Sequence, residues 1–594
     1  MLTLKKILSL FTPHDLQRAT LLLLMTFVMA LLDTIGVASI LPFMAVLGNP
    51  QIIETNIILK KMFEISSIFG VENNQEFLFA LGIIVFLLLV TSLIFKAWTS
   101  YVQVKFVHMS EYSISRRLVE GYLNQPYSWF LNHHSAELGK TILSEVSQVV
   151  GNGINPLIEV ISKGVITIAL ILLLIIANPK LALIVGLSLG GTYALIFYFS
   201  RKYLNRIGKD RLRNNRLRFT VVGEAFGAIK EIKVGGYEKN YVKRYEDPAK
   251  NFALSVAASV ILRLIPRYIL EIIAFGGIMI VILYLMAQTG SFNNALPIIS
   301  LYVFAGYRLL PSLQQIYSSL SQLAYVGPSL NSLSNDIKNL NFLKLEQTSK
   351  ILSFNNEISL KNICFNYPNT SRTALKDINL SIQAKTIVGL VGATGSGKTT
   401  TVDIILGLLE AQKGTLEIDG HVITKTNIRS WQKLIGYVPQ NIFLFDDTIA
   451  SNIAIGNESK NIDQAEIEKV CKIANLHEFI VNELPEQYQT KIGERGIRLS
   501  GGQRQRIGIA RALYHKPKVL ILDEATSALD NVTEKAVMDA INNLSRNITI
   551  IMISHRLNSL RKCNNIYTFE KGKVISQGPF EELINLNYEL KDAT

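Results

Sequence analysis

The sequence predicts an all-α membrane domain followed by an α/β domain. Long uncharged apolar stretches recur through the first part of the chain, whereas the later part carries short apolar runs typical of buried strands. The apolar share of the chain is 49% and its mean hydropathy is +0.28, which is high for a chain that also contains a polar α/β domain. We therefore expect the membrane domain at 1–325, a connector at 326–350 and the α/β domain at 351–594.

Six apolar stretches in the first part predict six transmembrane helices. Each is close to the roughly 20 residues that a helix needs to cross a bilayer. The first carries one charge, Asp33, and the second carries none. The six stretches are 19–48, 77–95, 156–177, 181–199, 268–287 and 296–317.

The basic residues predict the orientation of these helices. Eight Lys and Arg fall within 201–218, directly after the fourth stretch, while 288–295 carries no charge. The positive-inside rule then puts both termini in the cytosol. This also accounts for the net charge of +14 without a nucleic-acid partner. The three cysteines, Cys364, Cys471 and Cys563, all lie in the α/β part, which fits a reduced compartment without disulfides.

A glycine-rich loop at 392–399 fits the phosphate-loop pattern G-x-x-x-x-G-K-[ST]. An apolar run at 386–391 precedes it as a strand, and 400–409 follows as a helix. In this context backbone N–H groups surround phosphates at a helix N-terminus. Lys398 is expected to reach the β- and γ-phosphates, and Thr399 to hold Mg²⁺. The residues expected to bind ATP here are Gly392, Thr394, Gly395, Ser396, Gly397, Lys398, Thr399 and Thr400.

A second apolar run, 519–522, ends in two carboxylates. Asp523 suits Mg²⁺ coordination through water, and Glu524 suits polarisation of an attacking water. His555 follows a third run, 549–554. A single histidine is more often a structural hydrogen-bonding residue, but this position, after a strand and downstream of Asp523 and Glu524, favours a catalytic role.

Together these residues resemble the ATP-binding cassette family, and the resemblance covers the whole chain. It implies that Glu524 is the catalytic base, that His555 contacts the γ-phosphate and that Gln440 senses Mg²⁺ and the membrane domain. Tyr367 is implied to stack on adenine. The segment Leu499-Ser500-Gly501-Gly502-Gln503 resembles the family signature, which implies that Ser500, Gly501, Gly502 and Gln503 contact the ATP held by the opposite subunit.

The resemblance also implies an exporter architecture of type I, with an α/β P-loop ATPase after the membrane helices. The segment 493–496 resembles a motif typical of exporters, and 527–530 resembles a loop that crosses the dimer interface. Turns near 127–130 and 223–230 would contact the ATPase domains. Because the chain has one phosphate loop and one signature, the working unit is expected to be a dimer. A homodimer is the simplest case, and pairing with a different half stays open.

Charges near the spans are candidates for a substrate site, because they are expensive in a membrane. Lys96, Arg267 and Arg308 could lie at one depth and form a basic ring that binds phosphate or pyrophosphate. The alternative is that Arg267 pairs with Glu271 and that Lys96 extends to the interface. In the expected outer loop, Ile58, Met62, Ile65 and Phe69 could share one face of an amphipathic interfacial helix or simply pack on neighbouring spans.

These membrane features resemble the bacterial lipid-linked oligosaccharide flippases of protein glycosylation. One departure is Gln315, where that group carries a further arginine. The resemblance implies an inner-membrane homodimer that moves a polyprenyl-diphosphate glycan among membrane lipids. The alternative is an exporter of hydrophobic drugs, lipid A-like lipids or peptides. A cytosolic ATPase of this superfamily would carry two cassettes and no spans, and a nucleotide-gated channel would be expected to lack a catalytic residue.

Overall fold

The computed structural model describes residues 2–582 except 69, 178, 290–291, 341–351, 369, 371–372, 494–495, 527, 545–546 and 555–559. The chain divides into two compact units. One contains 1–125 and 130–342. The other contains 343–594 together with the short segment 126–129.

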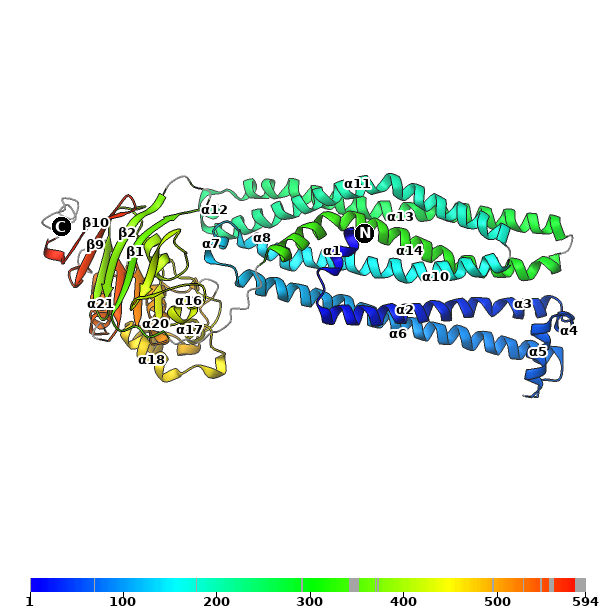
Figure 1. The fold of residues 1–594 in the computed structure, drawn as a ribbon, viewed down its shortest axis with the longest axis horizontal. Coiled ribbons are helices and arrows are strands. Elements are labelled where there is room, and N and C mark those ends of the chain that lie inside the picture. Colours follow the sequence, from blue (N-terminus) through cyan, green and yellow to red (C-terminus); the bar gives the residue numbers. More distant parts are fainter. Residues whose placement is uncertain are drawn as a thin grey trace. The chain divides into compact units, whose positions relative to one another are not determined.

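Every regular element described in the first unit is a helix, and its long helices lie side by side (Figure 1). α6 alone has 50 residues, which at 1.5 Å per residue is about 75 Å, far more than the roughly 30 Å of a bilayer core. Its elements are α1 (Leu2–Leu8), α2 (Pro13–Ala38), α3 (Ile40–Gly48), α4 (Ile52–Thr55), α5 (Ile57–Ser67), α6 (Asn74–Leu123), α8 (Ser135–Lys140), η1 (Thr141–Glu145), α9 (Val146–Val149), η2 (Val150–Ile154), α10 (Asn155–Ala177), α11 (Pro179–Gly227), α12 (Ile229–Gly235), α13 (Glu238–Thr289) and α14 (Phe292–Asn339).

Three stretches of the described residues are helical, long and apolar enough to cross a membrane: Pro13–Gly48, Asn74–Leu123 and Ser135–Ile176. They contain the first three expected spans. The other three fall in α11, α13 and α14, whose description is incomplete at 290–291 and for many side chains. α14 continues beyond the expected domain end at 325, to Asn339.

The helices of this unit pack in neighbouring pairs: α2 with α6, α10 with α14, and α11 with α13. Leu170 and Leu174 of α10 are buried in a core that also contains Met29 of α2 and Leu309 of α14. Because lipid tails are as apolar as leucine, such a core between membrane helices is stabilised by close packing of side chains and not by removal from water. This core therefore joins α2, from the beginning of the unit's sequence, to α14, from its end.

The outer connection contains a helix, α5, as expected, and the spacing of Ile58, Met62 and Ile65 places them on one side of it. Met62 of α5 packs against a core formed by α3, α4 and α6, beside Leu59. Ile58 and Ile65 are 71% and 59% exposed. The expected apolar face is therefore packed at Met62 and exposed at Ile58 and Ile65, so an interfacial role of this helix stays a prediction, and Phe69 lies outside the described residues.

The second unit is an α/β domain with two sheets. The six-stranded sheet has the order β10-β9-β3-β8-β7-β6, and its β3, β8, β7 and β6 are parallel. A smaller antiparallel sheet has the order β2-β1-β4-β5. The strands are β1 (Glu357–Asn366), β2 (Thr373–Gln383), β3 (Ile387–Val391), β4 (Lys413–Ile418), β5 (His421–Val422), β6 (Ile435–Val438), β7 (Val519–Asp523), β8 (Thr549–Ile553), β9 (Asn565–Glu570) and β10 (Lys573–Gly578).

Helices cover the parallel sheet, as continuous apolar strands require, because β3, β7 and β8 are buried along their whole length. The helices described in this unit are α15 (Lys398–Ile405), α16 (Ile428–Gln432), α17 (Ile449–Ile453), η3 (Ser459–Asn461), α18 (Gln464–Ile473), α19 (His477–Glu483), η4 (Gln487–Gln489), α20 (Gly501–Tyr514) and α21 (Asn531–Leu544). The short α7 (Tyr127–Phe130) has most of its residues in this unit.

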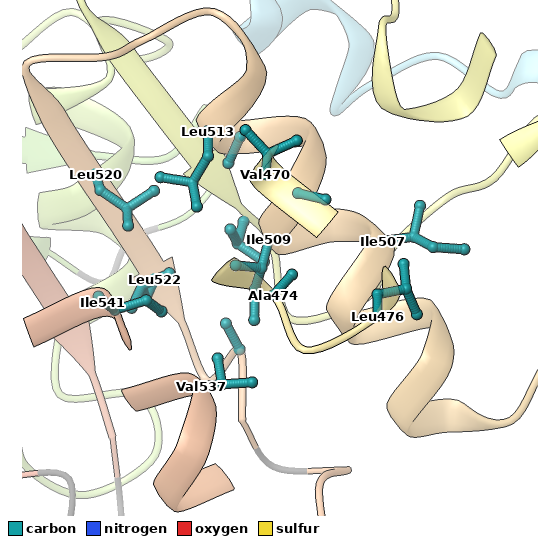
Figure 2. Close-up of a cluster of buried hydrophobic side chains, with 14 of the residues drawn as sticks. Val470, Ala474, Leu476, Ile507, Ile509, Leu513, Leu520, Leu522, Val537 and Ile541 are labelled. Atoms are coloured by element: carbon teal, nitrogen blue, oxygen red, sulfur yellow. The ribbon is translucent and has the colours of Figure 1, made fainter. Parts of the chain in front are cut away.

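A buried cluster joins β7 to α18, α20 and α21 (Figure 2). Leu520 and Leu522 extend from β7 toward Ile509 and Leu513 of α20, and Val537 of α21 closes the cluster. The strand that ends in Asp523 and the helix that begins after Ser500 are thus held by the same core.

Candidate active site

The carboxyl ends of three parallel strands bring the predicted nucleotide residues together. β3 leads into the loop at Gly392, β7 ends at Asp523, and β6 leads toward Gln440. Val438 pairs with Leu522, so the β6 and β7 ends are level. Ligands bind at this edge of open α/β sheets.

The phosphate loop lies directly against strand β9. Gly392 has a φ of +142°, and a Cβ at this position would lie 2.2 Å from the Phe569 carbonyl oxygen, so only glycine fits. The other end of the loop is bonded to the β9–β10 turn, where the Gly572 N–H donates to the Ser396 carbonyl at 2.9 Å. The loop is therefore fixed at both ends by the same hairpin.

Lys398 and Ser396 lie inside this loop with buried polar groups. The Lys398 ammonium donates to the carbonyls of Gly392 at 2.5 Å and Ala393 at 3.0 Å. Burial lowers the pKa of Lys398, against the attraction of Glu524 and Asp523. The Ser396 hydroxyl is buried and has no hydrogen-bond partner in the described part of the chain. An uncompensated buried donor beside a lysine fits an oxyanion ligand.

An open pocket of about 280 Å³ adjoins the loop. Tyr367 lies on its wall, with its hydroxyl 3.1 Å from the Thr400 hydroxyl. Its ring packs edge-on against Phe365, so one aromatic supports the other. The pocket is lined by Tyr367, Thr370, Thr373, Ala374, Gly395, Gly397, Lys398, Thr399, Thr400, Lys571 and Gly572.

Of the two carboxylates at the end of β7, Glu524 lies beside Gln440. The Gln440 side-chain amide donates to a Glu524 carboxylate oxygen at 2.8 Å. Glu524 has a φ of +48°, a strained conformation that persists only where the surroundings impose it and is common at functional sites. Burial raises the pKa of Asp523, and the neighbouring Glu524 charge raises it further. These groups together supply the oxygen ligands that Mg²⁺ prefers.

The signature residues form the start of helix α20. The Ser500 hydroxyl accepts from the Gln503 N–H at 3.2 Å, and the Gln503 side-chain oxygen accepts from the Ser500 N–H at 2.7 Å. This capping box satisfies two N–H groups of the first turn. Gly501 and Gly502 lie beside Ala528, where a Cβ on either would be 3.3 Å from its nearest neighbour.

Two features of the nucleotide site were not predicted from the sequence, namely Gln505 and the Lys571–Gly572 turn. Gln505 donates to the Glu524 carbonyl at 3.4 Å and accepts from the Ala528 N–H at 2.9 Å, so it joins the signature helix to the carboxylate loop. Its place one helical turn after Gly501 was the available signal. The Lys571–Gly572 turn had none, because it follows the phosphate loop by more than 170 residues.

Three predicted segments fall outside this description. His555 lies outside the described residues, as do Ser527 of the predicted interface loop and the pair 494–495 of the exporter motif. Their predicted roles stay predictions.

Residues 126–129 of the expected first turn belong to the α/β unit. Tyr127 interacts electrostatically with Asp403 and Tyr367, and burial raises its pKa. Tyr437, three residues before Gln440, is near Tyr127 and Asp403 as well. A segment from between the membrane helices thus lies beside the nucleotide residues.

The structure describes the three predicted substrate residues, Lys96, Arg267 and Arg308, to different extents. The Arg267 Nε donates to Glu271 at 2.7 Å, and these side chains are 52% and 41% exposed. The pairing that the sequence offered as an alternative is therefore present. Lys96 is half-buried on α6, and the side chain of Arg308 lies outside the description. Asp33 is buried and accepts from the Ser92 hydroxyl at 2.8 Å, which ties α2 to α6.

The fold and the pocket define a multi-pass membrane protein with a nucleotide-binding P-loop domain. Residues 375–527 match the family model described as ABC transporter, and 40–308 match that of the ABC transporter transmembrane region. The chain belongs to the ABC transporter family. The predicted fold class is thereby confirmed, and so is an ATPase coupled to transport.

Several relatives are similar over most of their length. An ATP-dependent lipid A-core flippase of Cupriavidus pinatubonensis is 30% identical over 78% of each chain. That of Wigglesworthia glossinidia brevipalpis is 32% identical over 80% of this chain and 81% of its own. The heterocyst differentiation ATP-binding protein HepA of a Nostoc species is 31% identical over 77% and 74%. The structure of an ATP-bound bacterial Atm1-family ABC exporter matches 97% of both chains with a TM-score of 0.79 at 20% identity, which supports the fold.

Proposed function

We propose that this half-transporter is a flippase that moves a polyprenyl-diphosphate-linked glycan across the bacterial inner membrane. The observation that carries the substrate proposal is the exposed Arg267–Glu271 pair at the start of the fifth expected span. Ionisable residues in such positions mark substrate pathways by default. The arginine has five N–H donors, so it can bind a phosphate oxygen while it keeps Glu271. Lys96 and Arg308 would add to the same basic site.

A lipid A-like lipid is the second candidate. Its support is the similarity to lipid A-core flippases at 30–32% identity. Both candidates are lipids with a phosphorylated sugar headgroup, so the chemistry of Arg267 suits either.

For ATP hydrolysis we assign roles to residues of this chain. When ATP binds, the Lys398 ammonium gives up its hydrogen bonds to the loop carbonyls and donates to β- and γ-phosphate oxygens instead. The Ser396 hydroxyl donates to the phosphates in the same loop. Glu524 accepts the proton of the attacking water once Gln440 releases it. Bound Mg²⁺ supplies positive charge against the phosphates, and Thr399, Asp523 and Gln440 would hold it.

The assembly that fits these roles is a homodimer with both termini in the cytosol. Each chain supplies one phosphate loop and one signature, so Ser500 of one copy would reach the nucleotide of the other. Alternating access then follows from closure and release of the two ATPase units.

The test is ATP-dependent translocation of a fluorescent undecaprenyl-diphosphate glycan in proteoliposomes. We expect flipping by the wild type, none by Glu524→Gln, and a reduction of roughly 10-fold for Arg267→Ala, as for a lost charge-assisted hydrogen bond. Arg244→Ala is the matched control, because Arg244 forms an exposed ion pair with Glu224 outside the expected spans. ATP hydrolysis without flipping of this lipid, but with flipping of a lipid A-core lipid, would favour the second candidate.

A further inference from the structure

Pro266 interrupts the hydrogen bonding of helix α13. A proline has no N–H, so the carbonyl four residues earlier, that of Leu262, loses its helical partner. The structure supplies another one: the Tyr317 hydroxyl of α14 donates to the Leu262 carbonyl at 2.9 Å. A bond that is normally internal to one helix is here a bond between two helices.

Tyr317 is enclosed at this junction. Its side chain is 2% exposed, and its ring stacks on Tyr193 of α11 with centroids 5.3 Å apart and planes at 29°. Pro266 is itself buried. Tyr193 is close enough to interact electrostatically with both Arg267 and Glu271. Three helices therefore meet around Tyr317, beside the exposed ion pair.

This arrangement couples the shape of α13 to the position of α14. A change of bend at 262–266 must either break the Tyr317 bond or move α14 with it. Breaking it would leave a part-buried carbonyl without its partner, which is unfavourable. Arg267 follows Pro266 directly, so the direction of its side chain depends on that bend.

We propose that Tyr317 is a positioning residue: its hydroxyl joins α13 to α14 at the break made by Pro266 and fixes how the Arg267–Glu271 pair is presented to the lipid headgroup. The part concerning the headgroup rests on the proposed function. The joint between the helices does not.

The experiment is a double-mutant cycle in the full-length protein. Tyr317→Phe keeps the ring and removes the hydroxyl. Pro266→Ala restores an N–H that can bond to the Leu262 carbonyl within α13. Tyr325→Phe is the matched control, because Tyr325 is also buried on α14 and its hydroxyl has no partner among the described residues. The readouts are KM and kcat of ATPase activity stimulated by the undecaprenyl-diphosphate glycan, and the unfolding temperature in detergent.

We expect Tyr317→Phe to raise the KM for the lipid roughly 5- to 10-fold, the range that corresponds to one lost buried hydrogen bond, with kcat nearly unchanged. Tyr325→Phe should match the wild type. In the Pro266→Ala background, Tyr317→Phe should have no further effect on KM or on unfolding, because the carbonyl is already satisfied.

Equal KM values for Tyr317→Phe and Tyr325→Phe would overturn the proposal, and so would full additivity of the two changes at 317 and 266. If this lipid stimulates no activity even in the wild type, the proposed substrate fails and not the joint. The unfolding temperatures then decide the joint alone: it stands if Pro266→Ala suppresses the loss caused by Tyr317→Phe.

Discussion

Glu524 combines a strained backbone with a hydrogen bond that occupies its carboxylate. The bond from Gln440 at 2.8 Å holds the carboxylate where β6 and β7 end together. A base that is already oriented needs no reorganisation when water is to be activated. In the proposed mechanism, Gln440 would orient Glu524 and, until it moves, occupy the carboxylate oxygen in place of water.

Glu524→Gln should lower ATP turnover by about 10²- to 10⁴-fold, the usual contribution of a general base, while ATP binding persists. Phosphate release and ATP-dependent cross-linking of two copies measure these separately. Glu410→Gln, on an exposed side chain paired with Lys425, should leave both unchanged. Normal phosphate release by Glu524→Gln would exclude the role as base.

Asp403 on α15 should make the stability of the ATPase domain depend on pH. Burial, and then the charge of Asp523, raises the pKa of Asp403 to about 6 from 3.8. Because the raised pKa belongs to the folded state, the ionised carboxylate destabilises the fold above pH 6, and this penalty disappears as both states become protonated near pH 4.

Asp403→Asn should therefore raise the unfolding temperature at pH 8 and raise it less at pH 5, in the absence of nucleotide and Mg²⁺. Differential scanning fluorimetry at both pH values measures it. Glu410→Gln again serves as the control. An equal gain at both pH values would show that the packing of the amide, and not the charge, is responsible.

Among the elements, the β9–β10 hairpin has a role that its length does not suggest. Its turn residue Gly572 donates to Ser396 in the phosphate loop and accepts from the Lys376 N–H of β2 at 2.8 Å. A Cβ on Gly572, whose φ is +82°, would lie 2.6 Å from the Ala374 carbonyl oxygen. The turn thus ties the phosphate loop to the strand that follows the Tyr367 segment.

Gly572→Ala should displace this turn and weaken the binding of both ATP and tripolyphosphate by about 10-fold or more. An alanine in the left-handed conformation costs roughly 1 kcal/mol of conformational free energy by itself, and the displacement of the turn adds to that cost. Gly420→Ala is a close match, because Gly420 has a φ of +77° in the β4–β5 turn but open space around it. Isothermal titration with each ligand checks this. Equal affinities for the two variants would refute a role of the turn in phosphate binding.

The sequence predicted those elements whose residues form a recognisable local pattern, such as an apolar run or a motif. The phosphate loop and Asp523–Glu524 follow strands that read as continuous apolar runs, and the structure places them at one edge of a sheet. Periodicity predicted the shared side of α5 but did not decide whether that side packs on neighbouring elements, as Met62 does against α3, α4 and α6. Gly572, Gln505 and Tyr317 act through partners from 19 to 196 residues away, so no local pattern marks them.

For the whole molecule, each chain holds one phosphate pocket and one signature helix in the same compact unit. In the proposed homodimer these two features serve different nucleotides. Each ATP would then be bound by residues of both copies. One chain alone should therefore bind ATP but not hydrolyse it efficiently.

The capping box at Ser500 has a consequence for how the two copies meet. The serine oxygen uses a lone pair to accept from Gln503, and a hydroxyl that accepts in this way still carries its proton. The same atom can therefore stabilise its own helix and donate to a phosphate of the neighbouring copy at the same moment. The signature helix would reach the interface already in its binding conformation, so closure of the dimer would require no local refolding.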